Sequence, residues 1–487
     1  MRPTLLVLAI SLSGCMVGPK YKKPAAPVPT TYKEAPPAGW KEAQPSDEKI
    51  RGKWWELYGD PALNALEEQV AINNQNVIAA EANYRVAKAQ VRVARAALFP
   101  TVATSPSVTV SGSGSRNVTT NGTTGTITGS AGGGVTQRYI LPVDVSWQID
   151  VWGSIRRSIN ANVDLAQAAG AEVENVRLLY QSEVAIDYFQ LHGIDGETTL
   201  LERTVKDYTD FLDLTRKRFA GGIATDADVA QAEEQLYNAQ TQLTDLGVAR
   251  AQLEHAIAVL TGKPPANLTL PAVTQRPDPP PVPVALPSTL LERRPDIAEA
   301  ERRMASANEQ IGIAHAAFYP TLNLGGSAGF QSSTIGSLLT WPSRFWSVGP
   351  QLAETIFDAG RRRGQLQIAE AEYDVNTANY RQTVLTAFQQ VEDNLAELRI
   401  LEQETSELRR ATAAAERALD VSTAQYTAGT TPYLQVLVSQ TIVLADQRAE
   451  INLLTRRLAA SVSLIQALGG GWDTTKLPSV GEIRSNK

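Results

Sequence analysis

The sequence makes the same unusual change from helix to strand at two places. In residues 295–317 the apolar side chains recur at helical spacing, and in residues 321–330 they alternate, with Pro320 at the boundary. The same change occurs 220 positions upstream, where Pro100 separates a helical pattern from an alternating one. A long helix that leads directly into a strand twice indicates an internal duplication, so the fold should contain two copies of one unit.

The rest of each unit also repeats. A second alternating segment ends shortly before Gly153 in the first half and before Gly360 in the second. A long helical pattern then runs to a turn at Gly222 or Gly429, and both pairs of glycines are 207 positions apart. The longer helix would extend roughly 100 Å at about 1.5 Å per residue. A globular domain has no use for such a rod, which predicts an elongated protein.

The pattern divides the chain into six segments. In chain order they are a signal peptide (1–14), a lipidated tether (15–53), the first repeat with its hairpin at 100–151 (54–262), a Pro-rich linker (263–290), the second repeat with its hairpin at 320–357 (291–472) and a C-terminal tail (473–487). Residues 112–134 are rich in Gly, Ser, Thr and Asn, which predicts a flexible loop within the first hairpin.

The amino terminus resembles a bacterial lipoprotein signal. Arg2 precedes a short apolar run that ends in Leu12-Ser13-Gly14-Cys15, and Cys15 is the single cysteine of the chain. The resemblance implies cleavage before Cys15, attachment of lipid to it and sorting to the outer membrane, since Met16 is not the aspartate that retains lipoproteins in the inner membrane. An ordinary export signal with an incidental cysteine is the alternative.

Four amphipathic strands cannot make a complete structure by themselves. Val143, Val145 and Trp147 alternate with polar residues, so one face of the strand is apolar and the other polar. Four strands cannot close a barrel, and an open sheet cannot leave its edges unpaired in lipid. We therefore expect a mainly α protein with a small β part, in which three chains form a twelve-stranded barrel that continues into a barrel of helices.

Composition and motifs point away from catalysis. The three histidines are far apart in sequence, no phosphate loop or nucleophile elbow is present, and no basic block suggests nucleic acid. The sequence therefore predicts no catalytic residues, no metal site and no cofactor.

The chain resembles the outer-membrane factors of tripartite efflux pumps, the TolC-like channels, and in particular the lipoprotein NodT-type branch that works with resistance-nodulation-division transporters. The matching segments cover nearly the whole mature chain. They are Val17–Tyr21 after the lipoprotein signal, Trp54-Trp55 with Asp60–Leu63, Trp147–Gly153, Leu291–Ile297, Ala317–Pro320 and Gln466–Trp472. The resemblance implies a homotrimer that passively conducts small molecules, such as drugs, from an inner-membrane transporter and a periplasmic adaptor protein.

The resemblance also assigns roles to the two helix–turn–helix ends. It implies that the adaptor docks on the short turns, which here are Gly222, Ile223, Ala224 and Gly429, Thr430, Thr431. Relatives often close the periplasmic end with a Leu, which Leu434 matches, and with an Asp four residues later, where this chain has Val438. Thr427 stands where an Arg is common. We therefore expect an apolar gate at Leu434 and Val438, unless Asp226 or Asp228 supplies an acidic ring.

Several alternatives remain open at this point. Leu434 can be a packing residue, and the two turns can be simple helix breaks, with Thr225 and Asp228 forming a capping box in the first. A channel for type I protein secretion and a structural lipoprotein rod are the alternative functions. Conductance separates a rod from a channel, and the pump encoded beside the gene separates the two kinds of channel.

Overall fold

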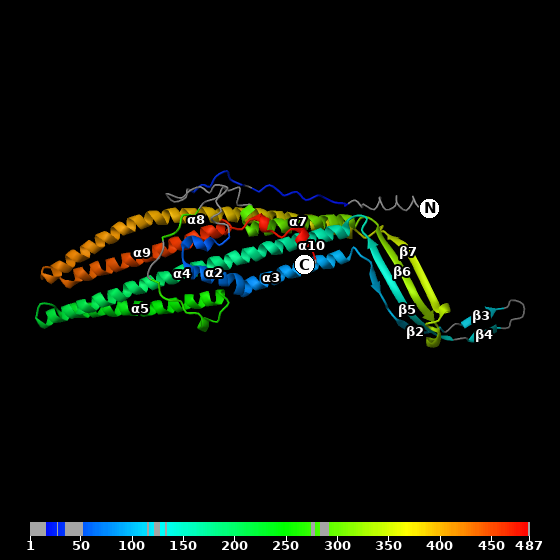
Figure 1. Cartoon of the computed structure of the whole chain (residues 1–487), viewed down its shortest axis with the longest axis horizontal. Coiled ribbons are helices and arrows are strands. Elements are labelled where there is room, and N and C mark those ends of the chain that lie inside the picture. The colour runs from blue at the N-terminus through cyan, green and yellow to red at the C-terminus, as the bar shows by residue number, and fades with distance from the viewer. Residues whose placement is uncertain are drawn as a thin grey trace.

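The computed structural model describes residues 16–26, 28–34, 52–113, 116–120, 127–131, 134–273, 278–282 and 292–485. The molecule is elongated, with a rod of helices at one end and a β-sheet that projects from the other (Figure 1). Within the described residues, no helix combines the length and apolar character needed to cross a membrane.

The helices of the two halves match in order and length. The first half contains α3 (Gln75–Ala96), α4 (Ser154–Ala220) and α5 (Asp226–Leu260). The second half contains α7 (Pro295–Ala316), α8 (Arg361–Thr427) and α9 (Tyr433–Ala467). In both halves the three helices have 22, 67 and 35 residues. The repeat expected from the sequence is therefore present at the level of whole elements.

Short elements complete the helical part. They are the 3-10 turn η2 (Trp54–Tyr58), α2 (Pro61–Asn73), η3 (Pro265–Asn267), η6 (Thr474–Lys476) and α10 (Val480–Arg484). Asp60 caps α2 by accepting from the amides of Ala62 and Leu63. Trp54, Trp55 and Tyr58 are buried in the main core together with Phe189, so the tryptophan pair anchors the amino-terminal segment to the helices.

The sheet is antiparallel and has two strand positions from each half, because β1 and β2 lie one after the other along the same edge of β5. Its strands are β1 (Thr101–Ala103), β2 (Ser107–Ser113), β5 (Gly134–Ile149), β6 (Thr321–Ser332) and β7 (Arg344–Ala353). β1 and β2 both pair with β5, which pairs with β6, which pairs with β7. The central register places Val143 opposite Ala328. Two short turns, η4 (Ile335–Ser337) and η5 (Trp341–Ser343), connect β6 to β7.

Three sequence predictions were wrong in detail. The expected loop at 112–134 contains a hairpin of β3 (Arg116–Thr120) and β4 (Ile127–Ala131), because Val and Thr side chains interrupt its glycines. The hairpin expected at 320–357 ends earlier, because its last strand stops at Ala353. The helical pattern before Pro100 is not one long helix but is broken at Asn74. The extended backbone and side chain of Asn74 cap α3, and its Nδ2 donates to the carbonyl of Leu260.

Two tryptophans of the first hairpin fix the helix-to-strand junctions. The indole of Trp147 donates to the carbonyl of Leu98 at 2.9 Å, and the indole of Trp152 donates to the carbonyl of Pro320 at 2.8 Å. Trp152 also stacks on Tyr319, with ring centroids 4.7 Å apart. Because one tryptophan serves each junction, the two halves are held together where the rod meets the sheet.

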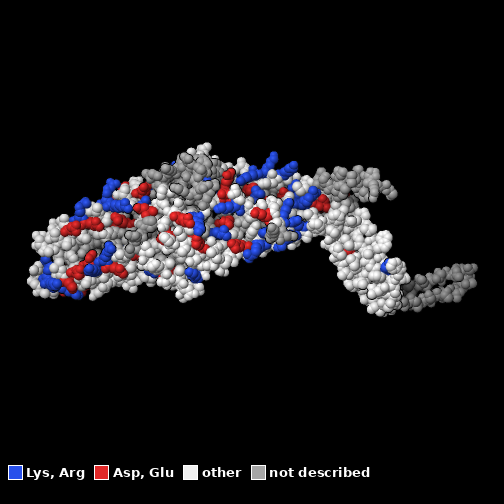
Figure 2. Space-filling view, viewed as in Figure 1, with Lys and Arg blue, Asp and Glu red and all other residues white. Residues whose placement is uncertain are grey.

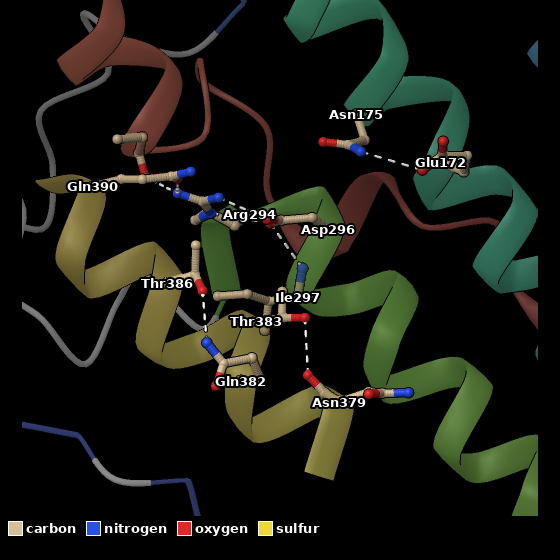
Figure 3. A network of polar contacts seen from close by, with 11 residues as sticks. Glu172, Asn175, Arg294, Asp296, Ile297, Asn379, Gln382, Thr383, Thr386 and Gln390 are labelled. Atoms are coloured by element: carbon tan, nitrogen blue, oxygen red, sulfur yellow. Dashed lines mark hydrogen bonds and ion pairs between the residues drawn. The ribbon is translucent and has the colours of Figure 1, made fainter. Parts of the chain in front are cut away.

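An arginine joins the second half at the level of the main core. Arg294 is buried and lies before α7, where it donates to Asp296, to Oε1 of Gln390 on α8 and to the carbonyl of Ala467 at the end of α9 (Figure 3). Hydrogen bonds from a charged donor are stronger than neutral ones, so this arrangement fixes the start of α7 and the end of α9 against the middle of α8.

The amino-terminal segment is docked on the helices rather than free. We call its described residues, 16–26 and 28–34, the strap. Val17 donates its amide to the carbonyl of Trp152, the Tyr21 hydroxyl donates to Glu301 at 2.6 Å, and the amides of Lys33 and Glu34 donate to Glu392. The strap thus follows the rod from the edge of the sheet toward its middle. Cys15, the expected lipidation site, lies outside the described residues.

Candidate functional site

The first turn at the far end of the rod joins α4 to α5. Gly222 has a φ of +74°, a left-handed conformation that favours glycine, and the amides of Ile223 and Ala224 donate to the carbonyl of Arg218. Thr225 and Asp228 form the expected capping box, with Thr225 accepting from the amide of Asp228 and Asp228 accepting from that of Thr225. The Ile223 side chain is 70% exposed, so the turn presents an apolar group to solvent.

The second turn joins α8 to α9 at the same end of the rod (Figure 1). Gly429 has a φ of +77°, and both the amide and the hydroxyl of Thr430 donate to the carbonyl of Gln425. Thr431 donates to the side chain of Gln425. Gly429 and Thr430 are exposed, which leaves the backbone of this turn accessible.

Arg218 links the two helix–turn–helix ends. Its guanidinium lies 4.5 Å from the ring centre of Tyr426, and its Nη1 donates to the carbonyl of Thr427 at 3.2 Å. Tyr426 also packs against Phe211 and Tyr433 within a buried cluster of both halves. The side chain of Thr427 itself is exposed and donates only to Thr423 within the same helix. The guanidinium of Arg218, from the first half, therefore lies beside Thr427, the position at which relatives commonly have an arginine.

The expected gate residues lie on one exposed face of α9. Leu434 is 54% exposed and Val438 is 46% exposed, while Tyr433 just before them and Val436 between them are buried. Ile442, one turn further, is exposed on the same face, so the apolar stripe spans positions i, i+4 and i+8. Leu434 is therefore not a packing residue within the protomer. Sequence reasoning missed Ile442, although the same four-residue spacing could have identified it.

The two candidate acids belong to the first half. Asp226 is exposed and Asp228 is half-buried in the first turn of α5, and the hydroxyl of Thr225 donates to the Asp228 carboxylate. The stripe on α9 itself is apolar at all three positions. Within the described part of the chain, no group of three His, Cys, Asp or Glu side chains could hold a metal ion.

Arginines at the opposite end of the rod have separate roles. Arg156 and Arg362 follow the glycines after β5 and β7, and each pairs with an aspartate, Asp150 or Asp358. Arg157 is instead buried, and it binds Glu309 and two carbonyls of the strap. These arginines occupy similar positions in the sequence, and their burial and partners distinguish them.

Comparison with known proteins agrees with this architecture. A family model described as outer membrane efflux protein matches residues 66–263 and 286–470. The chain belongs to the outer membrane efflux protein family. It is 31% identical to the probable efflux pump outer membrane protein TtgC of Pseudomonas putida over 473 residues, which cover 96% of this chain and 95% of the relative.

Further members of the outer membrane efflux protein family are similar over almost their whole length. The pyoverdine export outer membrane protein OpmQ of Pseudomonas aeruginosa is 30% identical, with 93% of this chain and 94% of OpmQ covered. The solved structure of the outer-membrane channel OprN has a TM-score of 0.83 and 27% identity, covering 94% of this chain and all of that one. This family member is thus an outer-membrane efflux protein with the mainly helical fold of the solved channels.

Proposed function

We propose that the protein is the outer-membrane exit channel of a tripartite efflux pump and that it works as a homotrimer. In this role three copies form one pore, which passively conducts small toxic molecules delivered by a resistance-nodulation-division transporter and a periplasmic adaptor protein. The channel does no chemistry of its own. Cys15 would carry the lipid that anchors each copy in the outer membrane.

The open sheet is the observation that carries this proposal. Among the described strands, β2 pairs only with β5 and β7 pairs only with β6, so each side of the sheet has an unpaired edge. One face exposes Val143, Val145, Trp346 and Val348, while Asp144 on the other face accepts from the hydroxyl of Ser327. Apolar outer faces, polar inner faces and open edges are the properties of one part of a membrane barrel. Further copies would pair the edges, and three give twelve strands.

The far end of the rod supports the docking and gating roles. Both turns expose small residues and backbone, which suits the adaptor contact proposed for Gly222, Ile223, Ala224 and Gly429, Thr430, Thr431. In a trimer, the apolar stripes of three α9 helices would meet around one axis. We propose that Leu434 and Val438 form the closed gate there, with Asp226 and Asp228 outside its narrowest part.

Sedimentation, bilayer recording and gene deletion test the proposal. The detergent-extracted protein should migrate as a trimer in sedimentation experiments, and it should produce stepwise currents in planar bilayers. Deletion of the gene should raise susceptibility to small toxic compounds, whereas secretion of a protein substrate should not change. A monomer without currents would refute the channel. Loss of protein secretion with unchanged susceptibility would instead favour type I secretion.

A further inference from the structure

A cationic cavity of about 350 Å³ lies where the helices meet the sheet, between α3, α4, α10 and the strap. Arg95 comes from the last turn of α3, Arg156 from the first turn of α4 and Arg484 from the end of α10. Leu98 and Ile159 supply an apolar wall. Lys and Arg side chains gather along this end of the rod on the face seen in Figure 2.

The positive charge of the cavity is only partly neutralised. Arg156 is bound to Asp150, with Nε and Oδ2 3.1 Å apart. Arg95 donates to the main-chain carbonyl of Arg484 at 2.5 Å, and Arg484 donates to the Asn160 amide oxygen at 2.9 Å. Within the described residues neither Arg95 nor Arg484 has a carboxylate within salt-bridge distance. Each guanidinium has five N–H donors, so donors remain for a ligand.

The acid on the same short helix as Arg484 is engaged elsewhere. Glu482 lies on α10, but its carboxylate accepts from the amide and hydroxyl of Ser479. Among the described residues, the lining of the cavity therefore contains three arginines and no carboxylate, and Asp150 pairs with one of these arginines from outside the lining. Such an excess of positive charge beside an apolar wall fits a ligand that has an anionic head and an apolar tail.

The position of the cavity indicates the source of that ligand. Phe99, Ile356 and Phe357 are strongly exposed at the adjoining end of the sheet, and Trp147 is bound to the carbonyl of Leu98 there. Aromatic side chains gather at the boundary between a membrane and water. The cavity lies on the helical side of this boundary, which is the level of phospholipid headgroups.

The strap adds a second indication. Met16 lines the cavity and packs so closely on Gly153 that a Cβ on this glycine would come within 2.6 Å of the methionine side chain. The chain therefore enters the cavity from the direction of its amino terminus.

We propose that this cavity binds the phosphate of an anionic phospholipid, whose acyl chains pass Phe99 toward the apolar face of the sheet. The planar forks of Arg95 and Arg484 match phosphate oxygens, and basic pockets beside a membrane bind such headgroups. The inference depends on the outer-membrane location of the protein and is independent of conduction through the pore.

Native mass spectrometry of the full-length protein in detergent tests the proposal, with phosphatidylglycerol and phosphatidylcholine as probes. The wild-type protein should retain phosphatidylglycerol in preference to phosphatidylcholine. The double variant R95Q/R484Q should bind phosphatidylglycerol about 30-fold more weakly, because each basic residue near an anionic surface contributes about fivefold in affinity. The single variants should each lose about fivefold and provide the test if the double variant does not fold.

A matched control separates the cavity from general surface charge. R85Q/R381Q removes the same charge from exposed positions on α3 and α8 that do not line the cavity, and it should bind phosphatidylglycerol as the wild type does. Equal losses in both double variants, or no loss in R95Q/R484Q, would overturn the proposal. So would equal retention of the two lipids. Displacement of phosphatidylglycerol by an equal concentration of inorganic phosphate would assign the cavity to a free anion and also overturn it.

Discussion

Replacement of Arg157 by Met should release the strap from the rod. Nε of Arg157 donates to the carbonyl of Val17 at 2.7 Å, Nη2 donates to that of Pro19 at 3.2 Å, and Nη1 pairs with Glu309 at 3.0 Å. The side chain is 3% exposed, and a Cβ on Gly312 would lie only 2.2 Å from it, so the arginine packs directly on the backbone of this glycine. Methionine keeps most of the apolar stem and removes all of these donors.

The expected loss follows from these contacts. Two hydrogen bonds from a charged donor contribute about 1.5 kcal/mol each, so the strap loses about 3 kcal/mol of its attachment. At about 1.4 kcal/mol per factor of ten, the detached population should rise about 150-fold. The side chain of Glu309 is 13% exposed and would remain buried without its partner, which brings the total destabilisation to about 3–5 kcal/mol.

Limited trypsin digestion at Lys20, Lys22 and Lys23 measures the detachment, because cleavage of a transiently opened segment follows its population. The control is Arg156→Met, which removes the neighbouring arginine. The side chain of Arg156 is 36% exposed and its pair with Asp150 should contribute less than about 1 kcal/mol. Cleavage rates that are equal in the two variants, or an Arg157→Met rate close to that of the wild type, would refute this reasoning.

Three further predictions concern the gate and the helical interfaces. Arg218→Ala removes the contact with the Tyr426 ring and the hydrogen bond to Thr427, which together contribute about 1–2 kcal/mol. The open fraction of single channels in planar bilayers should therefore rise, and an unchanged fraction would contradict the link between the two ends. The wild-type channel should be only weakly blocked by divalent cations, and Val438→Asp should create strong block, whereas strong block before substitution would point to Asp226 or Asp228. Burial raises the pKa of Asp164 to about 7, above its ordinary value of 3.8, so the folded state holds a proton that the unfolded state has lost. Stability should therefore be highest at low pH and fall as the pH rises toward 7, and thermal unfolding followed by circular dichroism should show a shallower fall for Asp164→Asn.

The repeated pattern made the element order predictable. Helical spacing, strand alternation and the glycines of the two turns are local signals, and each can be recognised without knowledge of the fold. Gly222 and Gly429 do adopt left-handed conformations, and Leu434 and Val438 do lie exposed on one face of α9. The break at Asn74 was missed because a polar residue within a helical pattern gives no sign that it will bind Leu260, 186 positions away.

The docked strap was also beyond sequence reasoning. Its composition indicated an extended tether, which is a statement about local backbone preference. The strap is held to the rod by Tyr21, which donates to Glu301, 280 positions later, and by the buried Arg157. The preceding residue, Arg156, is also an arginine but is partly exposed.

The sequence by itself determined that the chain contains two copies of one unit, which consists of a helix, a hairpin and a pair of long helices. Hydrophobic periodicity and turn residues indicate these elements because both act over only a few positions. It also determined that one chain could not complete its own sheet, since the number of amphipathic strands is countable. Only the tertiary structure decided that Arg157 holds the strap, that Arg218 links the two turns and that Arg95 and Arg484 line a cavity. Those roles follow from burial and from partners contributed by distant segments, and identical side chains acquire different energies only when the fold fixes their surroundings.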